Sequence, residues 1–217
     1  LRARDIRTFD DLRRLPITRR ADLQAERNEF LSRAPGMEPA LVLSTSGTTG
    51  RPLEMYLTPG EFDYYVAVQA LSGMNLGFLG PAHVLQVHLS QDFSFAARVF
   101  SAAAVKAGAM VLNAGVTGDL DASLESLTRL RDLPGKHPRV SGLFAAPGQL
   151  WALTARAEAL GLSPSSFGLR RVFTCGAKVS SALRERVQRV FGLPLREAYS
   201  MVETPGTGVF ECEQGRL

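Results

Sequence analysis

The most informative stretch of this chain is residues 45–52, which read Thr45-Ser46-Gly47-Thr48-Thr49-Gly50-Arg51-Pro52. Two glycines alternate there with hydroxyl-bearing side chains, and apolar segments flank the stretch on both sides. Glycine lets backbone N–H groups converge on an anion, while Ser and Thr hydroxyls add donors that rotate to suit it. The stretch therefore predicts a loop that holds phosphate groups. It is not a Walker A loop, because Arg and Pro follow the last glycine where that motif requires Lys and then Ser or Thr.

The composition predicts one globular unit. With 217 residues and 45% hydrophobic residues, the chain is long enough for one substantial core. Its apolar runs are shorter than the roughly 20 residues of a membrane span, and no signal peptide is visible. Two cysteines are too few for a disulfide framework or a zinc module, which favours a reducing, cytoplasmic location. The net charge of +4 comes mostly from arginines interspersed with acidic residues, so we expect neither nucleic-acid nor membrane binding.

Short apolar runs alternate with longer helical patterns along the chain. This alternation predicts an α/β fold in which a largely parallel sheet is flanked by helices in layers. Strands are expected over residues 41–43, 54–57, 83–87, 109–112, 140–145, 171–174 and 195–199. Helices are expected to begin at the Thr58 capping box and after Pro147, and to span residues 94–107, 119–130 and 180–191.

Three polar segments directly follow predicted strands. Residues 45–50 follow the first strand, residues 176–178 follow the sixth, and residues 200–203 follow the last. In open α/β sheets, ligands bind outside the carboxyl ends of the strands. We therefore expect the three segments to converge on one crevice.

These segments, taken in order, resemble three motifs of the adenylate-forming superfamily. Residues 45–53 are similar to its phosphate loop, (S/T)-S-G-T-T-G-x-P-K, although Leu53 replaces the usual Lys. Residues 174–178 lie at the position of its adenine-flanking loop, and residues 195–203 resemble its adenine-and-magnesium motif, in which a strand ends in Y-G-x-(T/S)-E. The Pro-Gly-Thr-Gly-Val-Phe-Glu-Cys run at residues 205–212, and the entry segment at residues 9–23, resemble the phenylacetate–CoA ligase branch.

The resemblance implies a fold and a reaction. The fold is the N-terminal AMP-binding lobe of an adenylate-forming enzyme, which residues 1–217 are expected to represent in part; the C-terminal lobe lies outside this chain. The reaction is ATP-dependent activation of a carboxylic acid to an acyl-adenylate, followed by thioester formation with CoA. ATP, Mg²⁺ and CoA are the implied cofactors of this AMP-forming acid–thiol ligase. Because the family supplies a catalytic lysine from the other lobe, we expect the chain by itself to be inactive.

The resemblance also assigns roles to individual residues. Thr48 and Glu203 are the implied catalytic residues, and Glu203 is the implied Mg²⁺ ligand, since this hard cation takes carboxylate and phosphate oxygens together. Tyr199 offers an aromatic face to adenine. Either Glu197 or the backbone at Gly176 and Ala177 is implied to contact the exocyclic amine of adenine. The complete set of residues implied to bind the nucleotide is Thr45, Ser46, Gly47, Thr48, Thr49, Gly50, Gly176, Ala177, Glu197, Tyr199 and Ser200.

The acid-binding pocket is predicted from two further segments. Residues 91–95 after the third strand and residues 144–147 before a helix match segments that line the acid pocket in such enzymes. Small and aromatic side chains at Phe93, Phe95 and Ala146 suit an aryl or short acyl group. An ordinary core role for the two phenylalanines stays open.

Two other functions remain open on the sequence alone. The first is an adenylating enzyme that loads a carrier protein in place of CoA. The second is a non-catalytic nucleotide-binding homologue, which is favoured by four departures from the motifs: Leu53, Lys178, Ser200 and Val202. The acid itself and the oligomeric state are not predicted.

Overall fold

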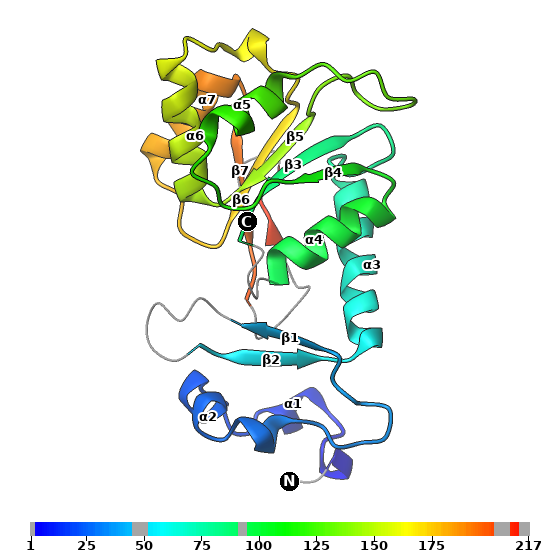
Figure 1. Ribbon diagram of the computed structural model, residues 1–217. Helices are drawn as coiled ribbons and strands as arrows, with labels where there is room; N and C mark the ends of the chain where they lie inside the picture. The colour runs from blue at the N-terminus through cyan, green and yellow to red at the C-terminus, as the bar shows by residue number, and fades with distance from the viewer. Residues whose placement is uncertain (1–2, 45–51, 91–94, 202–208, 213–217) are drawn as a thin grey trace.

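The computed structural model describes residues 3–44, 52–90, 95–201 and 209–212 (Figure 1). Within these residues, the main sheet has six strands in the order β4-β3-β5-β6-β7-β8. Its first five strands along the chain are parallel, and β8 pairs with β7 in the antiparallel sense. The strands are β3 (Val84–His88), β4 (Met110–Asn113), β5 (Gly142–Ala145), β6 (Arg171–Cys175), β7 (Leu195–Tyr199) and β8 (Val209–Phe210).

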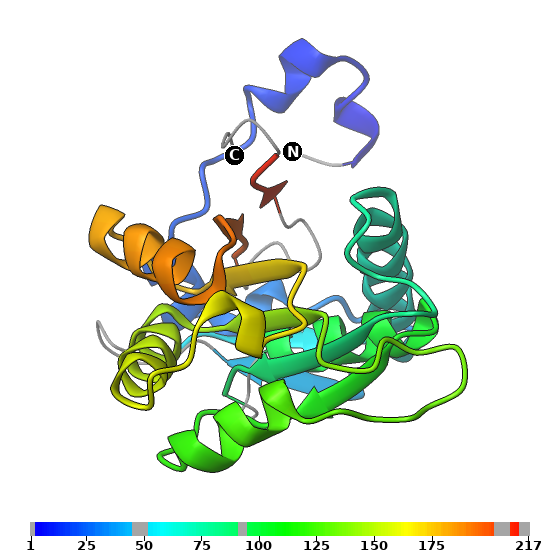
Figure 2. The same cartoon turned by 90° about the horizontal axis from the view of Figure 1, so that it is seen from above.

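Helices cover both faces of this sheet and complete a three-layer α/β fold (Figure 2). On one face, the helices α3 (Pro59–Asn75) and α4 (Phe95–Lys106) pack in a core that includes Val87, Phe100 and Phe144. On the other face, a second core includes Leu143, Leu153 and Val187. The helices that contribute to it are α5 (Leu120–Thr128), α6 (Pro147–Ala159) and α7 (Ser181–Phe191). Fully burying one such aliphatic side chain contributes about 1.5–3 kcal/mol, so these two layers dominate stability. The predicted layered, largely parallel α/β fold is confirmed.

The first two strands form a separate antiparallel sheet. β1 (Leu41–Ser44) pairs with β2 (Glu54–Leu57) in the register Leu41↔Leu57. The expected strands therefore exist, but they are not part of the parallel sheet. The reason is the short connection between them, because a parallel pair needs a crossover of a dozen or more residues.

Short helices precede and follow these elements. Before β1 the chain forms η1 (Ala3–Asp5), α1 (Phe9–Leu12), α2 (Arg20–Ala25) and η2 (Arg27–Phe30), and η3 (Pro164–Ser166) precedes β6. In Figure 1 the helices before β1 lie beyond the hairpin, away from the main sheet. Among the described residues, no helix is both long and apolar enough to cross a bilayer.

The capping box predicted at Thr58 starts α3. The Glu61 N–H donates to Thr58 Oγ1 at 3.2 Å, and the Thr58 N–H donates to Glu61 Oε2 at 2.8 Å. Pro59 occupies the first helical position, where its missing N–H costs no hydrogen bond. This start fixes how the hairpin joins the helix that covers the sheet.

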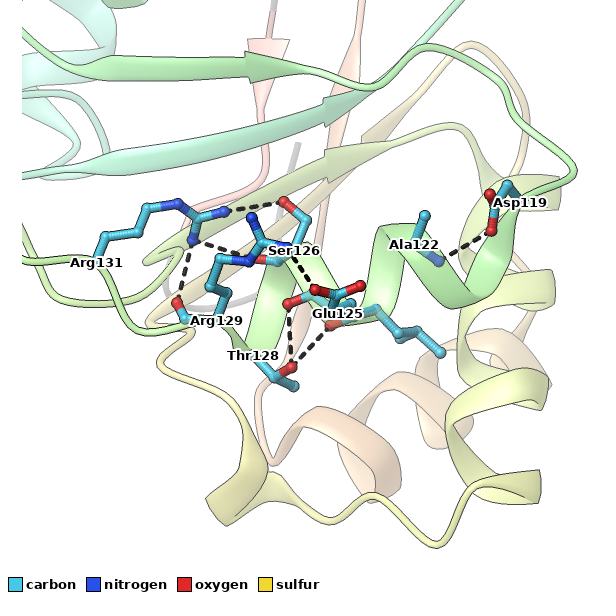
Figure 3. Close-up of polar contacts among 8 residues, drawn as sticks. Asp119, Ala122, Glu125, Ser126, Thr128, Arg129 and Arg131 are labelled. Atoms are coloured by element: carbon cyan, nitrogen blue, oxygen red, sulfur yellow. Dashed lines mark hydrogen bonds and ion pairs between the residues drawn. The ribbon is translucent and has the colours of Figure 1, made fainter.

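Side chains close both ends of α5 (Figure 3). Asp119 Oδ1 accepts the Ala122 N–H at 2.9 Å at the beginning of the helix. At its end, the Thr128 hydroxyl donates back to the Leu124 carbonyl at 3.1 Å, and Arg129 pairs with Glu125. Arg131 donates to the Ser126 carbonyl at 3.0 Å and to its hydroxyl at 3.1 Å. The helix therefore stops before the loop that leads to β5.

A buried polar pair joins β3 to the loop after β4. His88 is fully buried, and its Nδ1 lies 3.1 Å from the Gly115 carbonyl, so this nitrogen carries the proton. The Gln86 amide nitrogen then donates to His88 Nε2 at 2.8 Å and to the Ser123 carbonyl at 3.0 Å. Gly115 has φ of 65°, a conformation that favours glycine. Burial lowers the pKa of His88 below its ordinary value, and the bond to Gly115 only partly opposes this.

We predict that the protein loses stability as the pH falls through the ordinary histidine pKa. The unfolded chain takes up a proton near pH 6.5, whereas folded His88 resists it. The stabilisation is thus fully present above about pH 6.5 and declines below it, by at most roughly 1.4 kcal/mol per pH unit for one group.

His88→Gln should flatten the pH dependence of the free energy of unfolding, measured by urea unfolding at about pH 5.5, 6.5 and 7.5. His137→Gln is the comparison: burial lowers the pKa of that ring too, but its site is more exposed, so this variant should flatten the pH dependence less. An equal slope in His88→Gln and the wild type would rule out this role for His88.

Candidate active site

The topology brings the carboxyl ends of five strands to one edge. From β3 the chain crosses through α4 to β4, and from β5 it crosses through α6 to β6 on the opposite side. Strands β3 and β5 are neighbours, so the connections diverge between them and leave a crevice outside their carboxyl ends. The fold thus places a ligand site at this edge, which we call the carboxyl edge.

The predicted acid-binding segments lie at this divergence. Residues 91–94, including Phe93, fall outside the described residues; in the sequence they stand between Ser90, two residues past the end of β3, and Phe95, where α4 begins. Ala146 directly follows β5, is half-buried, and donates its N–H to the His88 carbonyl at 3.1 Å. The described ends of both segments, Ser90 and Ala146, therefore follow the two strands that border the crevice, and the acid-binding role of these segments stays a prediction.

The predicted adenine residues follow the next two strands along the edge. Gly176 and Ala177 come directly after β6 and are exposed. Gly176 has φ of 90°, and nothing lies within 4 Å of the position a Cβ would occupy. This backbone therefore needs glycine and has open space beside it, which suits the close approach of a flat ring.

Tyr199 ends β7 with 55% of its surface exposed, and Ser200 after it is also exposed. Tyr199 is therefore not a core aromatic. Neighbouring strands lie about 4.8 Å apart, so Tyr199 is roughly 10 Å along the edge from the end of β5.

Glu197 is engaged with other side chains of the protein. Its Oε2 accepts from Arg184 Nη2 at 2.9 Å, and its backbone N–H donates to Glu211 Oε2 at 2.9 Å. The carboxylate is directed toward α7, where Arg184 lies. Its assignment to the adenine amine stays a prediction.

The predicted phosphate loop and Glu203 lie outside the described residues. The loop's flanks are described: β1 ends at Ser44, and Leu53 precedes β2. The β1–β2 hairpin lies on the side of the main sheet toward which β7 runs (Figure 1). An open groove of about 530 Å³ separates the hairpin and the start of α3 from α4 and the end of β4. The strand that leads into residues 45–50 is therefore near the carboxyl edge.

A second cavity, of about 590 Å³, lies between the hairpin and the N-terminal helices. Its wall is mostly apolar, and among the described residues none of the predicted site residues lines it. Leu53 lines it and is only 2% exposed. The described wall of this cavity belongs to the hairpin and the N-terminal segments, not to the carboxyl edge.

The described residues contain no group of three His, Cys, Asp or Glu side chains that could hold a metal ion. A magnesium ion bound mainly by nucleotide phosphates needs as little as one protein carboxylate. The predicted Mg²⁺ ligand, Glu203, is such a carboxylate. His83 and His137 lie at the opposite edge of the sheet, where burial lowers the pKa of both rings.

Sequence reasoning missed Arg184 and Glu211 as residues of this region. Arg184 lies on α7 and reads as a solvated helix residue, while Glu211 directly follows β8, a strand of only two residues. The Glu-Cys end of the run at residues 205–212 was the one available signal. Their contacts appear only when α7, β7 and β8 are brought together.

The fold and the arrangement of the edge define a nucleotide-binding α/β lobe, and comparison with known proteins identifies its family. The model of the family described as AMP-binding enzyme matches residues 6–216. The chain belongs to this family. The suspected resemblance to adenylate-forming enzymes is thereby confirmed.

Similar proteins support the same assignment. The chain is 25% identical over 211 residues to the phenylacetate-coenzyme A ligase of Thermus thermophilus, across 97% of this chain and 45% of that protein. The solved structure of 2-hydroxyisobutyryl-CoA ligase in an open conformation shares the fold with a TM-score of 0.79 and 18% identity, covering 100% of this chain and 50% of that one. ATP-bound MatB from Rhodopseudomonas palustris has a TM-score of 0.59 and 20% identity, covering 80% and 31%. The chain spans about half the length of the first two relatives.

We predict that the two cysteines differ sharply in reactivity. Burial raises the pKa of Cys175 at the end of β6 to about 12, so at pH 8 very little of it is the reactive thiolate. Cys212 is exposed. Maleimide treatment of the native protein, followed by peptide mass spectrometry, should modify Cys212 and leave Cys175 intact, and both should react in urea. Rapid labelling of Cys175 in the native protein would show that the end of β6, at the carboxyl edge, opens far more than the structure indicates.

Proposed function

We propose that the whole protein activates a carboxylic acid with ATP and then forms its CoA thioester. In the first step a carboxylate oxygen attacks the α-phosphorus, pyrophosphate leaves, and an acyl-adenylate forms. In the second step the CoA thiol attacks the acyl carbon, AMP leaves, and the thiol proton passes to solvent. The observation that supports this proposal is the carboxyl edge, where the predicted acid segments and adenine segments follow adjacent strands of one sheet.

The residues of the edge suit these steps. Tyr199 presents its exposed ring to adenine, and the open backbone at Gly176 and Ala177 approaches the ring edge. Residues 45–50 supply N–H and hydroxyl donors for the β- and γ-phosphates. Glu203 holds the Mg²⁺ that accompanies ATP and neutralises phosphate charge. In such displacements the protein mostly positions the reactants and stabilises charge.

The acid occupies the crevice between β3 and β5. Phe93, Phe95 and Ala146 belong to the two segments that border it. An aryl or short acyl group fits an environment of small and aromatic side chains. The named relatives support this class: one is a phenylacetate-coenzyme A ligase, and another was solved with 2-HIB-AMP and CoA.

A carrier protein as acyl acceptor and a nucleotide-binding protein without catalysis are the alternatives. Leu53 is the observation that bears on the second. It occupies the place of the family's lysine but is 2% exposed, so an apolar side chain packed at the hairpin replaces a charged one. Thioester formation with free CoA separates the first alternative from the proposal. Acyl-adenylate formation separates the second.

Acid-dependent exchange of pyrophosphate into ATP by the whole protein tests this function, and a panel of aryl and short-chain acids identifies the substrate class. Thr48→Val/Thr49→Val should reduce ATP affinity by roughly tenfold or more, because two donors to a charged partner are removed at nearly constant volume. Thr128→Val, at the end of α5, is the control and should leave affinity unchanged. Equal ATP affinity in the double variant and the wild type would exclude the phosphate role of the loop.

Glu203→Gln tests the metal site. It keeps the shape of the side chain but removes the charge that Mg²⁺ prefers, so turnover should fall and the half-saturating Mg²⁺ concentration should rise by about tenfold. Glu185→Gln, at an exposed position of α7, is the matched control. A magnesium titration that coincides with that of the wild type would remove Glu203 from the site.

A further inference from the structure

One arginine of α7 joins this helix to β7 and to the segment that follows β8. Arg184 on α7 donates Nη2 to Glu197 Oε2 on β7 at 2.9 Å. Its Nη1 donates to Glu211 Oε2 at 3.0 Å and to the Leu195 carbonyl at 2.8 Å. The guanidinium therefore links α7, which carries it, to strand β7 and to the segment that follows β8.

The acidic partners depend on this cation. The Glu211 side chain is only 7% exposed, so its charge is largely withdrawn from water. It accepts from Arg184 and from the Glu197 N–H, while the Glu211 N–H donates to the Glu197 carbonyl at 2.9 Å. Without Arg184, two carboxylates would face each other with no cation between them in the described structure. An uncompensated buried charge is strongly unfavourable, so Glu211 would move toward solvent.

A movement of Glu211 would be transmitted to Tyr199. Strand β8 has two residues, and its register pairs Val209 with Tyr199 and Phe210 with Ala198. On one face Phe210 packs near Phe78, with ring centroids 5.2 Å apart; on the other face Glu211 is held by Arg184. So short an antiparallel strand has too few ladder bonds to fix its own position. Its anchoring therefore relies on these side chains.

We infer that Arg184 is a positioning residue of the nucleotide site. Acting through Glu211 and Glu197, it holds β8 against β7 and thereby fixes the backbone that presents Tyr199 to adenine. This inference rests on the proposed function, because it concerns how the same site binds its nucleotide.

The test compares Arg184→Met with Arg189→Met in the whole protein. Both variants remove an arginine of α7 that forms an ion pair, but Arg189 pairs with Glu158 on α6, away from β7. The probe is AMP in the absence of metal, measured by calorimetry, which isolates adenine and ribose binding from the Mg²⁺ site. Hydrogen exchange of peptides covering residues 195–201 and 209–212 reports on the β7–β8 pair without any ligand.

We expect Arg184→Met to weaken AMP binding by about tenfold and to speed exchange in both peptides. Arg189→Met should change neither. Arg184→Lys, which keeps the charge but cannot make the same set of bonds, should be intermediate. Adding Glu211→Gln to Arg184→Met removes the repulsion between the carboxylates and should restore part of the exchange protection.

The outcomes separate the two claims. If Arg184→Met binds AMP as tightly as the wild type, the inference is overturned, even when the melting temperature of the variant falls. A merely structural role would lower stability without changing AMP affinity. Equal loss of affinity in Arg189→Met also overturns it. Failure of the wild-type protein to bind AMP overturns the proposed function and the inference together. If the wild-type protein binds AMP and Arg184→Met binds it equally well, the inference alone is overturned.

Discussion

The parallel pairing of strands β3 to β7 is the constraint on which the rest of the structure depends. Parallel strands carry their carboxyl ends to the same edge, so segments far apart in the sequence are brought into one row. Each crossover must return over a face of the sheet, which places the helices in two outer layers. The apolar residues of both faces are then buried, and polar or small residues remain at the edge. The position of the site is thus a consequence of strand direction.

The sequence predicted the main elements because their signals are local. The buried strands read as short apolar runs, and α3 carries its own start signal in the Thr58 capping box. The structure departs from these expectations where the partner of a strand is not written in the strand itself. The apolar run of β1 does not reveal that it pairs with β2 outside the main sheet, and β8 is too short to show any periodicity. The place of β8 depends on packing against β7 and not on its own residues.

Part of the candidate site was predicted in the same way. Motif order located the segments at Gly176 and Tyr199, and a match to acid-pocket segments pointed to Ala146. All three lie at the carboxyl ends of neighbouring strands, while their roles stay predictions. Side-chain contacts were not predictable in the same way. Glu197 reads as a polar residue of a nucleotide motif, but its carboxylate is already bound by Arg184. That contact requires the angle at which α7 crosses β7, which no pattern in the sequence specifies.

The divergence of the chain between β3 and β5 has a consequence for how this fold diversifies. The proposed acid crevice is bordered by the segments that precede α4 and α6, whereas the residues predicted to bind adenine lie at the ends of β6 and β7. Under the proposed function, substitutions in the first pair of segments would alter the shape offered to the acid while the strands that carry the predicted nucleotide residues keep their pairing. Substrate range and nucleotide binding would then be encoded in different parts of the chain, so that selection could change the first without disturbing the second.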